Sequence, residues 1–262
     1  MFSDHLRELI RSRELFLIIV WRDIKIKYKQ SIMGFLWAIF MPIMIISAGI
    51  LVKYAMSVVS GKPLVLSDVS TVSVKSLPWA FFVGSIRFAT NSLLGNTNLV
   101  SKIHFPKEIF PIASVFSNLF DFVIAGVTLA LILAIAGIGV SIYLLWVPVL
   151  LIILIVQMIG LGMLLSAASL FFRDVKYIVE VLLTFGIFFT PVFYEAEMLG
   201  RWSTAIMLNP VAPILEGLNA CIVLHQGPDP VWIIYSAVVS CLVLGIGYPA
   251  FKKLEPLFAE SI

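Results

Sequence analysis

The chain has 262 residues, of which 61% are hydrophobic and only 13% are charged, and its net charge is +3. A mean hydropathy of +1.06 implies more apolar surface than one globular core can bury, which excludes a soluble single-domain protein. The small net charge and the grouping of the basic residues do not suggest a nucleic-acid partner. We therefore predict an all-α, multi-pass membrane protein with one domain over residues 1–262.

Residues 1–30 are predicted to form an amphipathic helix on a membrane surface. Apolar residues recur every three to four positions from Leu6 to Tyr28, with charged residues between them. The apolar run Leu15–Trp21 is too short to span, and the basic cluster Arg22–Lys29 follows it, unlike in a targeting signal. Such a helix would lie in the plane of the cytoplasmic leaflet, where its basic side chains meet anionic lipid.

Six stretches are long enough to cross a bilayer, which takes about 20 apolar residues at ~1.5 Å each. They are Ile32–Val52, Leu77–Val100, Ile109–Gly137, Ile142–Phe172, Tyr177–Tyr194 and Val231–Phe251. Most Lys and Arg residues then fall on the side that holds both termini, and the other side holds only Lys53, Lys62, Lys75 and Arg201. This bias predicts cytoplasmic termini, a membrane bundle over residues 31–251 and a cytoplasmic tail over residues 252–262.

Two shorter segments lie between the last two stretches. Met198–Met207 is amphipathic, and Val211–Leu224 carries Glu216 in its middle and follows Asn209-Pro210. Both are too short to span, so we predict two short re-entrant helices at the outer face. Backbone and carboxylates at that depth need protein or a wet cavity around them. We expect these helices, with Asn209 and Glu216, to gate the outer mouth of a pathway; the alternative is a lid-like loop packed on the spans.

A short polar interruption, Ser101–Pro111, separates the second and third stretches. Its charged residues alternate with apolar ones, and its two prolines are expected to mark where a short amphipathic element starts and stops. A connection this short needs no such pattern to reverse direction, which favours an element that docks on a partner. The alternative is a charged turn that obeys the positive-inside rule.

Five motifs occur in order along nearly the whole chain. They are Arg22–Ser31 followed by Gly34–Trp37, then Phe105–Pro111, Phe172–Val175, Thr190–Tyr194 and Leu208–Pro210. Together they resemble the permease subunits of bacterial type-2 ABC exporters, and most closely the branch that moves O-antigen, capsule and teichoic-acid polymers. One motif alone would be weak support, but the ordered set is specific.

The resemblance implies a homodimeric channel for a lipid-linked polysaccharide in the bacterial inner membrane, driven by two copies of a separate ATPase that binds ATP and Mg. It also implies that the loop Ser101–Pro111 couples the chain to that ATPase, with a second contact on the amino-terminal helix. The expected contact residues are Lys102, His104, Phe105, Pro106, Lys107, Glu108, Arg22 and Asp23. The sequence contains no Gly-x-x-x-x-Gly-Lys-Ser/Thr phosphate loop, which supports a separate ATPase. We expect no cofactor, metal or catalytic residue in this chain.

The pathway residues are predicted from the chemistry of the cargo. A polysaccharide offers hydroxyls and apolar C–H faces but little charge, so flat aromatic surfaces with scattered hydrogen-bonding groups suit it. Aromatic residues of the second stretch, Trp79, Phe81 and Phe82, are further candidates. The expected channel-lining residues are Trp37, Phe40, Phe185, Phe188, Phe189, Phe193 and Tyr194.

Polar residues inside the predicted spans need partners. The second stretch has a stripe at Arg87, Thr90, Asn91, Thr97 and Asn98, all on one face of a helix. We expect Arg87 to pair with Asp121 of the third stretch, as a structural ion pair rather than a substrate contact. Glu180 is expected to pair with Lys176, four residues before it on the same helix.

Other function classes fit the sequence less well. A lipid or drug exporter of the same class would share the architecture. A secondary transporter would need internal repeats, and a membrane-embedded glycosyl- or acyltransferase would need a catalytic cluster at a membrane face. The sequence has no evident repeat, and His5, His104 and His225 are scattered.

Overall fold

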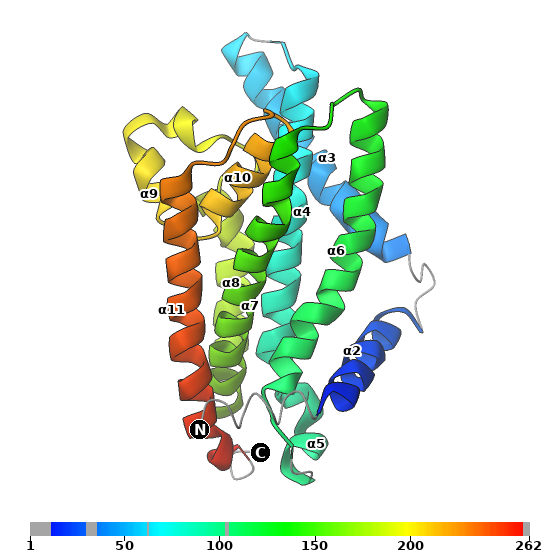
Figure 1. Cartoon of the computed structure of the whole chain (residues 1–262), viewed down its shortest axis with the longest axis vertical. Coiled ribbons are helices and arrows are strands. Elements are labelled where there is room, and N and C mark those ends of the chain that lie inside the picture. The colour runs from blue at the N-terminus through cyan, green and yellow to red at the C-terminus, as the bar shows by residue number, and fades with distance from the viewer. Residues whose placement is uncertain (1–11, 30–35, 62, 103–104, 259–262) are drawn as a thin grey trace.

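The computed structural model describes residues 12–29, 36–61, 63–102 and 105–258, and all regular secondary structure in these ranges is helical. The long helices stand side by side in one bundle, with α5 and the end of α11 at its lower end and α9 and α10 near its upper end (Figure 1). The α-helices are α2 (Arg13–Tyr28), α3 (Trp37–Ser60), α4 (Leu66–Asn91), α5 (Thr97–Lys102), α6 (Ile109–Ile135), α7 (Trp146–Phe171), α8 (Val175–Gly186), α9 (Ser203–Met207), α10 (Ala212–Ile222) and α11 (Pro230–Leu254). Short 3-10 helices accompany them: η2 (Leu94–Asn96), η3 (Ile142–Leu145), η4 (Ile187–Phe189), η5 (Ala196–Trp202) and η6 (Glu255–Leu257).

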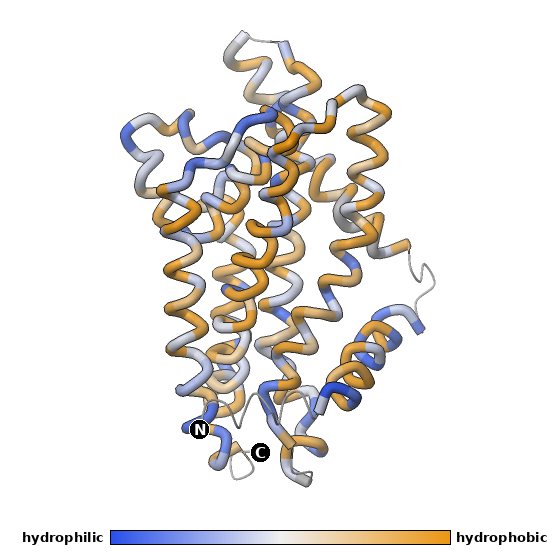
Figure 2. Tube along the Cα trace, viewed as in Figure 1, coloured by the Kyte–Doolittle hydropathy of each residue, from blue (hydrophilic) through white to orange (hydrophobic). Residues whose placement is uncertain are grey.

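Within the described ranges, four helices are long and apolar enough to cross a membrane: α4, α6, α7 with η3, and α11 with η6. Apolar residues dominate the middle of the bundle, and hydrophilic ones gather at the lower end and in the upper connections (Figure 2). The third, fourth and sixth predicted stretches are confirmed as α6, α7 and α11, each within about one helical turn. The first and fifth predicted spans are not among the four, so the count of six stays a prediction.

The second span was predicted too far along the chain. Helix α4 begins at Leu66 rather than Leu77, because its first half is polar but buried inside the protein. Its hydroxyls bond back to the helix itself: Ser70 Oγ donates to the Leu66 carbonyl at 3.0 Å and Ser73 Oγ to the Val69 carbonyl at 2.7 Å. The chain then turns after Asn91 into η2 and α5. The predicted polar stripe is therefore split between two helices.

Helices α3 and α8 differ from the first and fifth predicted spans at their upper ends. Helix α3 continues past Lys53 to Ser60 and ends at Gly61, whose φ of 70° lies in the left-handed region that favours glycine. Residues 32–35 of the first predicted span lie outside the described residues.

Helix α8 is only 12 residues long, and η4 follows it. The predicted continuous helix to Tyr194 is wrong because Thr190 is extended before Pro191, as steric contact with a following proline favours.

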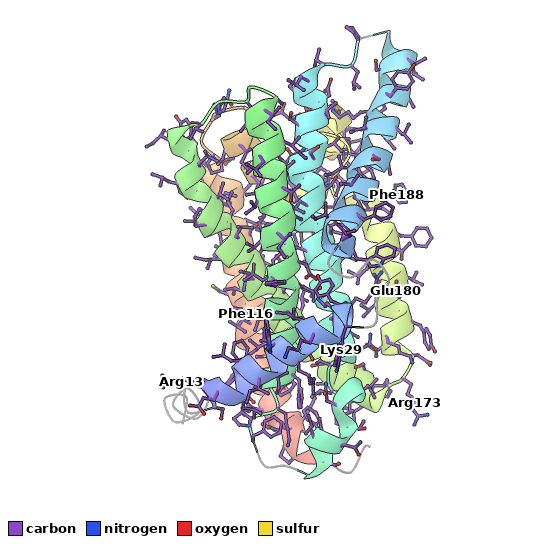
Figure 3. The ribbon with its side chains drawn as sticks, turned by 90° about the vertical axis from the view of Figure 1, so that its right-hand side faces the viewer. Arg13, Lys29, Phe116, Arg173, Glu180 and Phe188 are labelled. Atoms are coloured by element: carbon purple, nitrogen blue, oxygen red, sulfur yellow. The ribbon has the colours of Figure 1, made fainter. Side chains whose placement is uncertain are left out.

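Helix α2 crosses the lower part of the bundle at an angle to the long helices (Figure 3). It packs mainly on α6, where the rings of Phe16 and Phe116 lie 5.4 Å apart, edge to face. Its buried Ile19 belongs to a lower hydrophobic cluster with Phe110 and Phe258. A helix is thus present from Arg13 within the predicted range 1–30, whereas its amphipathic character stays a prediction. Residues 1–11 lie outside the described residues.

Helices α7 and α11 form the most extensive helix pair in the described structure. Glycines allow the close approach: a Cβ atom on Gly160 would lie 2.7 Å from the backbone nitrogen of Leu244, and one on Gly247 would lie 2.7 Å from the Gly160 carbonyl oxygen. Such distances are far below van der Waals contact. The α7–α11 pair therefore depends on the absence of side chains at these two positions.

Candidate functional site

A cavity of about 600 Å3 opens where α2, α3, α4, α6 and α8 meet. Its wall combines aromatic and aliphatic side chains with two basic side chains, one carboxylate, one amide and hydroxyl groups. Aromatic faces next to hydrogen-bonding groups suit a ligand that has both apolar faces and hydroxyls. The aromatic residues are Tyr28, Trp37, Trp79, Phe81, Phe88 and Phe122, and the other polar ones are Lys27, Arg87, Asn118, Asp121 and Thr184.

Arg87 faces this cavity but does not pair with Asp121 as predicted. Its Nε and Nη2 donate to the two carboxylate oxygens of Glu180, at 2.8 and 2.6 Å. The expected pair of Glu180 with Lys176 is therefore also replaced by an interhelical one. The side chains of Arg87 and Glu180 are 45% and 49% exposed, so this bidentate ion pair lies on the outer surface of the single chain.

Asp121 holds the end of α2 instead. One carboxylate oxygen accepts a hydrogen bond from Lys27 Nζ at 3.0 Å, and the other accepts one from the Tyr28 hydroxyl. Lys27 Nζ also donates to Asn118 Oδ1 at 3.0 Å. Burial and the neighbouring Asp121 both raise the pKa of Tyr28. The cluster fixes the amino-terminal helix to α6 at the edge of the cavity.

The predicted channel-lining aromatics fall into two groups. Most are well exposed on the surface of the single chain: Trp37, Phe40, Phe185, Phe188 and Phe189. Helix α8 and η4 carry three of them, and Figure 3 shows Arg173, Glu180 and Phe188 in ascending order along this segment. Phe193 instead packs against the core and approaches Gly49 of α3. The Tyr194 hydroxyl donates to the Phe188 carbonyl at 3.0 Å, which satisfies one carbonyl at the end of η4. Trp79, Phe81 and Phe82 are buried in the core.

Within the predicted coupling loop, residues 105–108 form a turn, whereas residues 101–102 end α5 and residues 109–111 begin α6. Phe105 packs on Phe110 with ring centres 5.5 Å apart, and Lys107 Nζ lies 4.5 Å above the Phe105 ring. Pro106 is buried, and Pro111 sits in the first turn of α6, so it does not end the element as predicted. Lys102 is the last residue of α5, and His104 lies outside the described residues.

Glu108 is fully buried instead of lying at the surface, where a direct partner contact would need it. Its Oε2 accepts a hydrogen bond from Lys252 Nζ of α11 at 2.7 Å. Burial raises the pKa of the Glu108 carboxyl, and the hydrogen bond from Lys252 opposes this rise. Arg22 and Asp23 pair with each other at 2.8 Å on α2 and remain partly exposed.

Charged side chains hold residues 194–196 in place at the upper end of the bundle. Lys75 of α4 is 0% exposed, and its Nζ lies 2.8 Å from Glu216 of α10 and 3.2 Å from the Tyr194 carbonyl oxygen. Glu216 also accepts a hydrogen bond from the Ala196 nitrogen at 3.0 Å. The prediction of Lys75 on an outer loop is therefore wrong.

Two further residues support the same segment. Lys53 of α3 lies 3.3 Å from Asp68 and 3.5 Å from Glu195. Asn209 Nδ2 donates to the Thr190 hydroxyl at 2.8 Å, and its Oδ1 accepts from the Val211 nitrogen at 3.2 Å. Both predicted outer residues, Asn209 and Glu216, thus contact the segment that follows η4.

Sequence reasoning missed three lysines that carry much of this architecture: Lys27, Lys75 and Lys252. Each was counted only as a charge on one side of the membrane. In the structure, Lys27 pairs with Asp121 of α6 and Lys75 pairs with Glu216 of α10. Lys252 pairs with Glu108, just before α6, and with Glu255 at its own end of α11. A lysine within or next to an apolar stretch signals that such a partner exists. It does not say which carboxylate it is.

The apolar helices define a multi-pass membrane protein. The model of the ABC-2 type transporter family matches residues 14–223, and the chain belongs to this family. It is 29% identical, over 98% of both chains, to the O-antigen export system permease protein RfbA of Myxococcus xanthus. It is also 24% identical, over 95% of both chains, to the protein of the same name from Klebsiella pneumoniae.

Proposed function

We propose that this chain is the transmembrane subunit of an ATP-driven exporter that moves a lipid-linked polysaccharide across the bacterial inner membrane. The names of the two relatives, which match nearly the whole chain, support the substrate class. The observation that carries a translocation role is the exposed Arg87–Glu180 ion pair beside an aromatic cavity. Charged side chains inside a membrane are costly when they face lipid, so this ion pair requires water or protein around it.

A second copy of the chain would meet these requirements. In the proposed homodimer, the exposed surface of α3 and α8 faces its symmetry mate across a pathway. The exposed aromatics Trp37, Phe40, Phe185, Phe188 and Phe189 then stack weakly on passing sugars, and Asn91 adds a polar group next to Arg87. Phe193 and Tyr194 would support the outer end of this wall, and Asn209 and Glu216 would act as an outer gate.

The proposed topology has six crossings with both termini in the cytoplasm, so the lower end of the bundle is cytoplasmic. The basic residues at that end support this orientation, for example Lys25, Lys102 and Arg173. Helix α2 would lie at the cytoplasmic membrane surface. The segment α8–η4 would form a short crossing, and α9 and α10 would be re-entrant at the outer face.

A separate ATPase, present in two copies, would bind ATP and Mg and dock at the lower end. Lys102, His104 and Phe105 would supply the contact, and Arg22 and Asp23 would add a second one. Pro106, Lys107 and Glu108 would support the loop from within because they are buried. The chain itself would then carry no catalytic residue.

Deletion of the chain in its own host tests the proposed function. The expected result is that the polysaccharide still forms but accumulates inside the cell on its lipid carrier, and that the intact chain restores it to the surface. The location of the polymer is measured by labelling intact and permeabilised cells with an antibody or a lectin that binds it. A deletion strain with normal surface polymer but an altered lipid or drug profile would favour the other exporter classes.

The pathway surface predicts a labelling pattern. In a variant without Cys221 and Cys241, Thr184→Cys should react with a membrane-impermeant maleimide because Thr184 lines the cavity. The matched control is Leu242→Cys on α11, whose exposed stripe is apolar throughout: Ile234, Val238, Leu242 and Ile246. This control should react only with a membrane-soluble reagent. Equal labelling of both positions by the impermeant reagent, or of neither, would contradict the assigned pathway.

A further inference from the structure

The carboxy-terminal end of α11 folds under the bundle instead of leaving it as a free tail. Phe251 and Phe258 are both buried, and their rings meet edge to face at 5.2 Å. Phe258 also lies 6.0 Å from Phe171 of α7. Leu254 and Phe258 are therefore packed in the lower cluster, and only residues 259–262 of the predicted tail lie outside the described residues.

This end of α11 binds the predicted coupling loop through two polar contacts, and a third joins the two residues that make them. Lys252 Nζ donates to Glu108 at 2.7 Å and to Glu255 at 2.9 Å. Glu255 in turn accepts a hydrogen bond from the backbone nitrogen of Lys107 at 3.0 Å. One lysine thus joins two carboxylates, and the second carboxylate reaches back to the loop.

Burial makes this arrangement hard to break. Glu108 is 0% exposed, and a carboxylate removed from water needs a cation and hydrogen bonds to stay ionised. Lys252 supplies the cation and one hydrogen bond, to Glu108 Oε2. Because Glu108 lies immediately before α6 and Lys252 belongs to α11, the cluster joins the first turn of one long helix to the last turn of another.

The cluster of Glu108, Lys252 and Glu255 is also attached to a rigid pair of helices, α7 and α11. Helix α11 packs along α7, with Gly160 and Gly247 in direct backbone contact. A displacement of the loop therefore cannot move α6 alone without either breaking the Glu108–Lys252 pair or carrying α11 with it. Packed helices transmit such movements as units because their interiors resist compression.

We infer that Lys252 and Glu255 are positioning residues for the coupling loop, and that the end of α11 forms part of the device that transmits the ATPase movement into the bundle. This inference rests on the proposed function, in which the loop docks on an ATPase. It adds a second route, through α11, to the expected route through α6.

The first test uses the chain without any partner. In Lys252→Met, backbone hydrogen exchange in residues 105–110 should become faster, because the loop loses its anchor on α11. The matched control is Lys253→Met, which removes an exposed lysine from the same turn and should leave this exchange unchanged. Unchanged exchange in folded Lys252→Met would overturn the positioning role, whatever the ATPase does.

The second test uses the chain and its proposed ATPase partner, reconstituted together in liposomes. Lys252→Met should still assemble and hydrolyse ATP, but polymer export per ATP should fall about tenfold, a usual size for coupling between linked sites. Lys252→Arg keeps the charge and should recover most export, and Lys253→Met should behave as wild type. Faster loop exchange with normal export per ATP would restrict the cluster to a structural role and overturn the coupling inference. A wild-type chain that binds no ATPase would instead refute the proposed function.

Discussion

Replacement of Lys75 by methionine should lower the free energy of unfolding by about 3–5 kcal/mol, the usual cost of removing one partner from a buried ion pair. Lys75 is completely buried on α4, and it is the cation within 2.8 Å of Glu216. Methionine fills a similar volume but cannot neutralise this carboxylate or donate to the Tyr194 carbonyl. Glu216 would remain charged in a site built for a pair. The measurement is unfolding of the purified chain in detergent, followed by tryptophan fluorescence.

Two matched variants identify the cause of this loss. Lys29→Met removes an exposed lysine and should change the unfolding free energy by less than about 0.5 kcal/mol. The double variant Lys75→Met/Glu216→Met should recover most of the loss, because it removes both charges together. If Lys75→Met unfolds like the wild type, or if the double variant is less stable than the single one, the unpaired carboxylate is not the cause.

Replacement of Gly160 by alanine should separate α7 from α11 and destabilise the bundle by about 1–3 kcal/mol or more, as overpacking of a tight interface does. The added Cβ would lie 2.7 Å from the backbone nitrogen of Leu244 and 2.8 Å from its Cα atom. Backbone atoms cannot rotate away as a side chain can, so a whole helix must shift. The loss should appear in the same detergent unfolding measurement.

Gly245 provides the control on the facing helix. A Cβ atom there meets no other atom within 4 Å, so Gly245→Ala should be neutral or slightly stabilising, since alanine favours the helix. Gly247→Ala should resemble Gly160→Ala, because its Cβ would lie 2.7 Å from the Gly160 carbonyl oxygen. Equal stability of the Gly160 and Gly245 variants would show that the two helices can separate without cost.

Five motifs in order along the chain, among them Phe105–Pro111 and Thr190–Tyr194, indicated the family, which the match over residues 14–223 confirms. The backbone conformation of these motifs could not be predicted from the sequence. Pro191 suggested a helix with one missing hydrogen bond, but the structure ends the helix before it. The carbonyls left at that end are satisfied by Thr190, Tyr194 and Asn209 within the chain.

The sequence by itself determined the class of protein and the location of α6, α7 and α11. Length and hydropathy are sufficient there, because a continuous apolar run in contact with lipid must be long enough to cross it and must bond its own backbone. Only the tertiary structure decided that α4 begins eleven residues earlier, at Leu66 instead of Leu77. It also decided that Arg87 binds Glu180 and Lys75 binds Glu216, pairs that are far apart along the chain. A polar residue records that it needs a partner, but the partner is chosen by which helices pack together, and that depends on contacts between residues distant in the sequence.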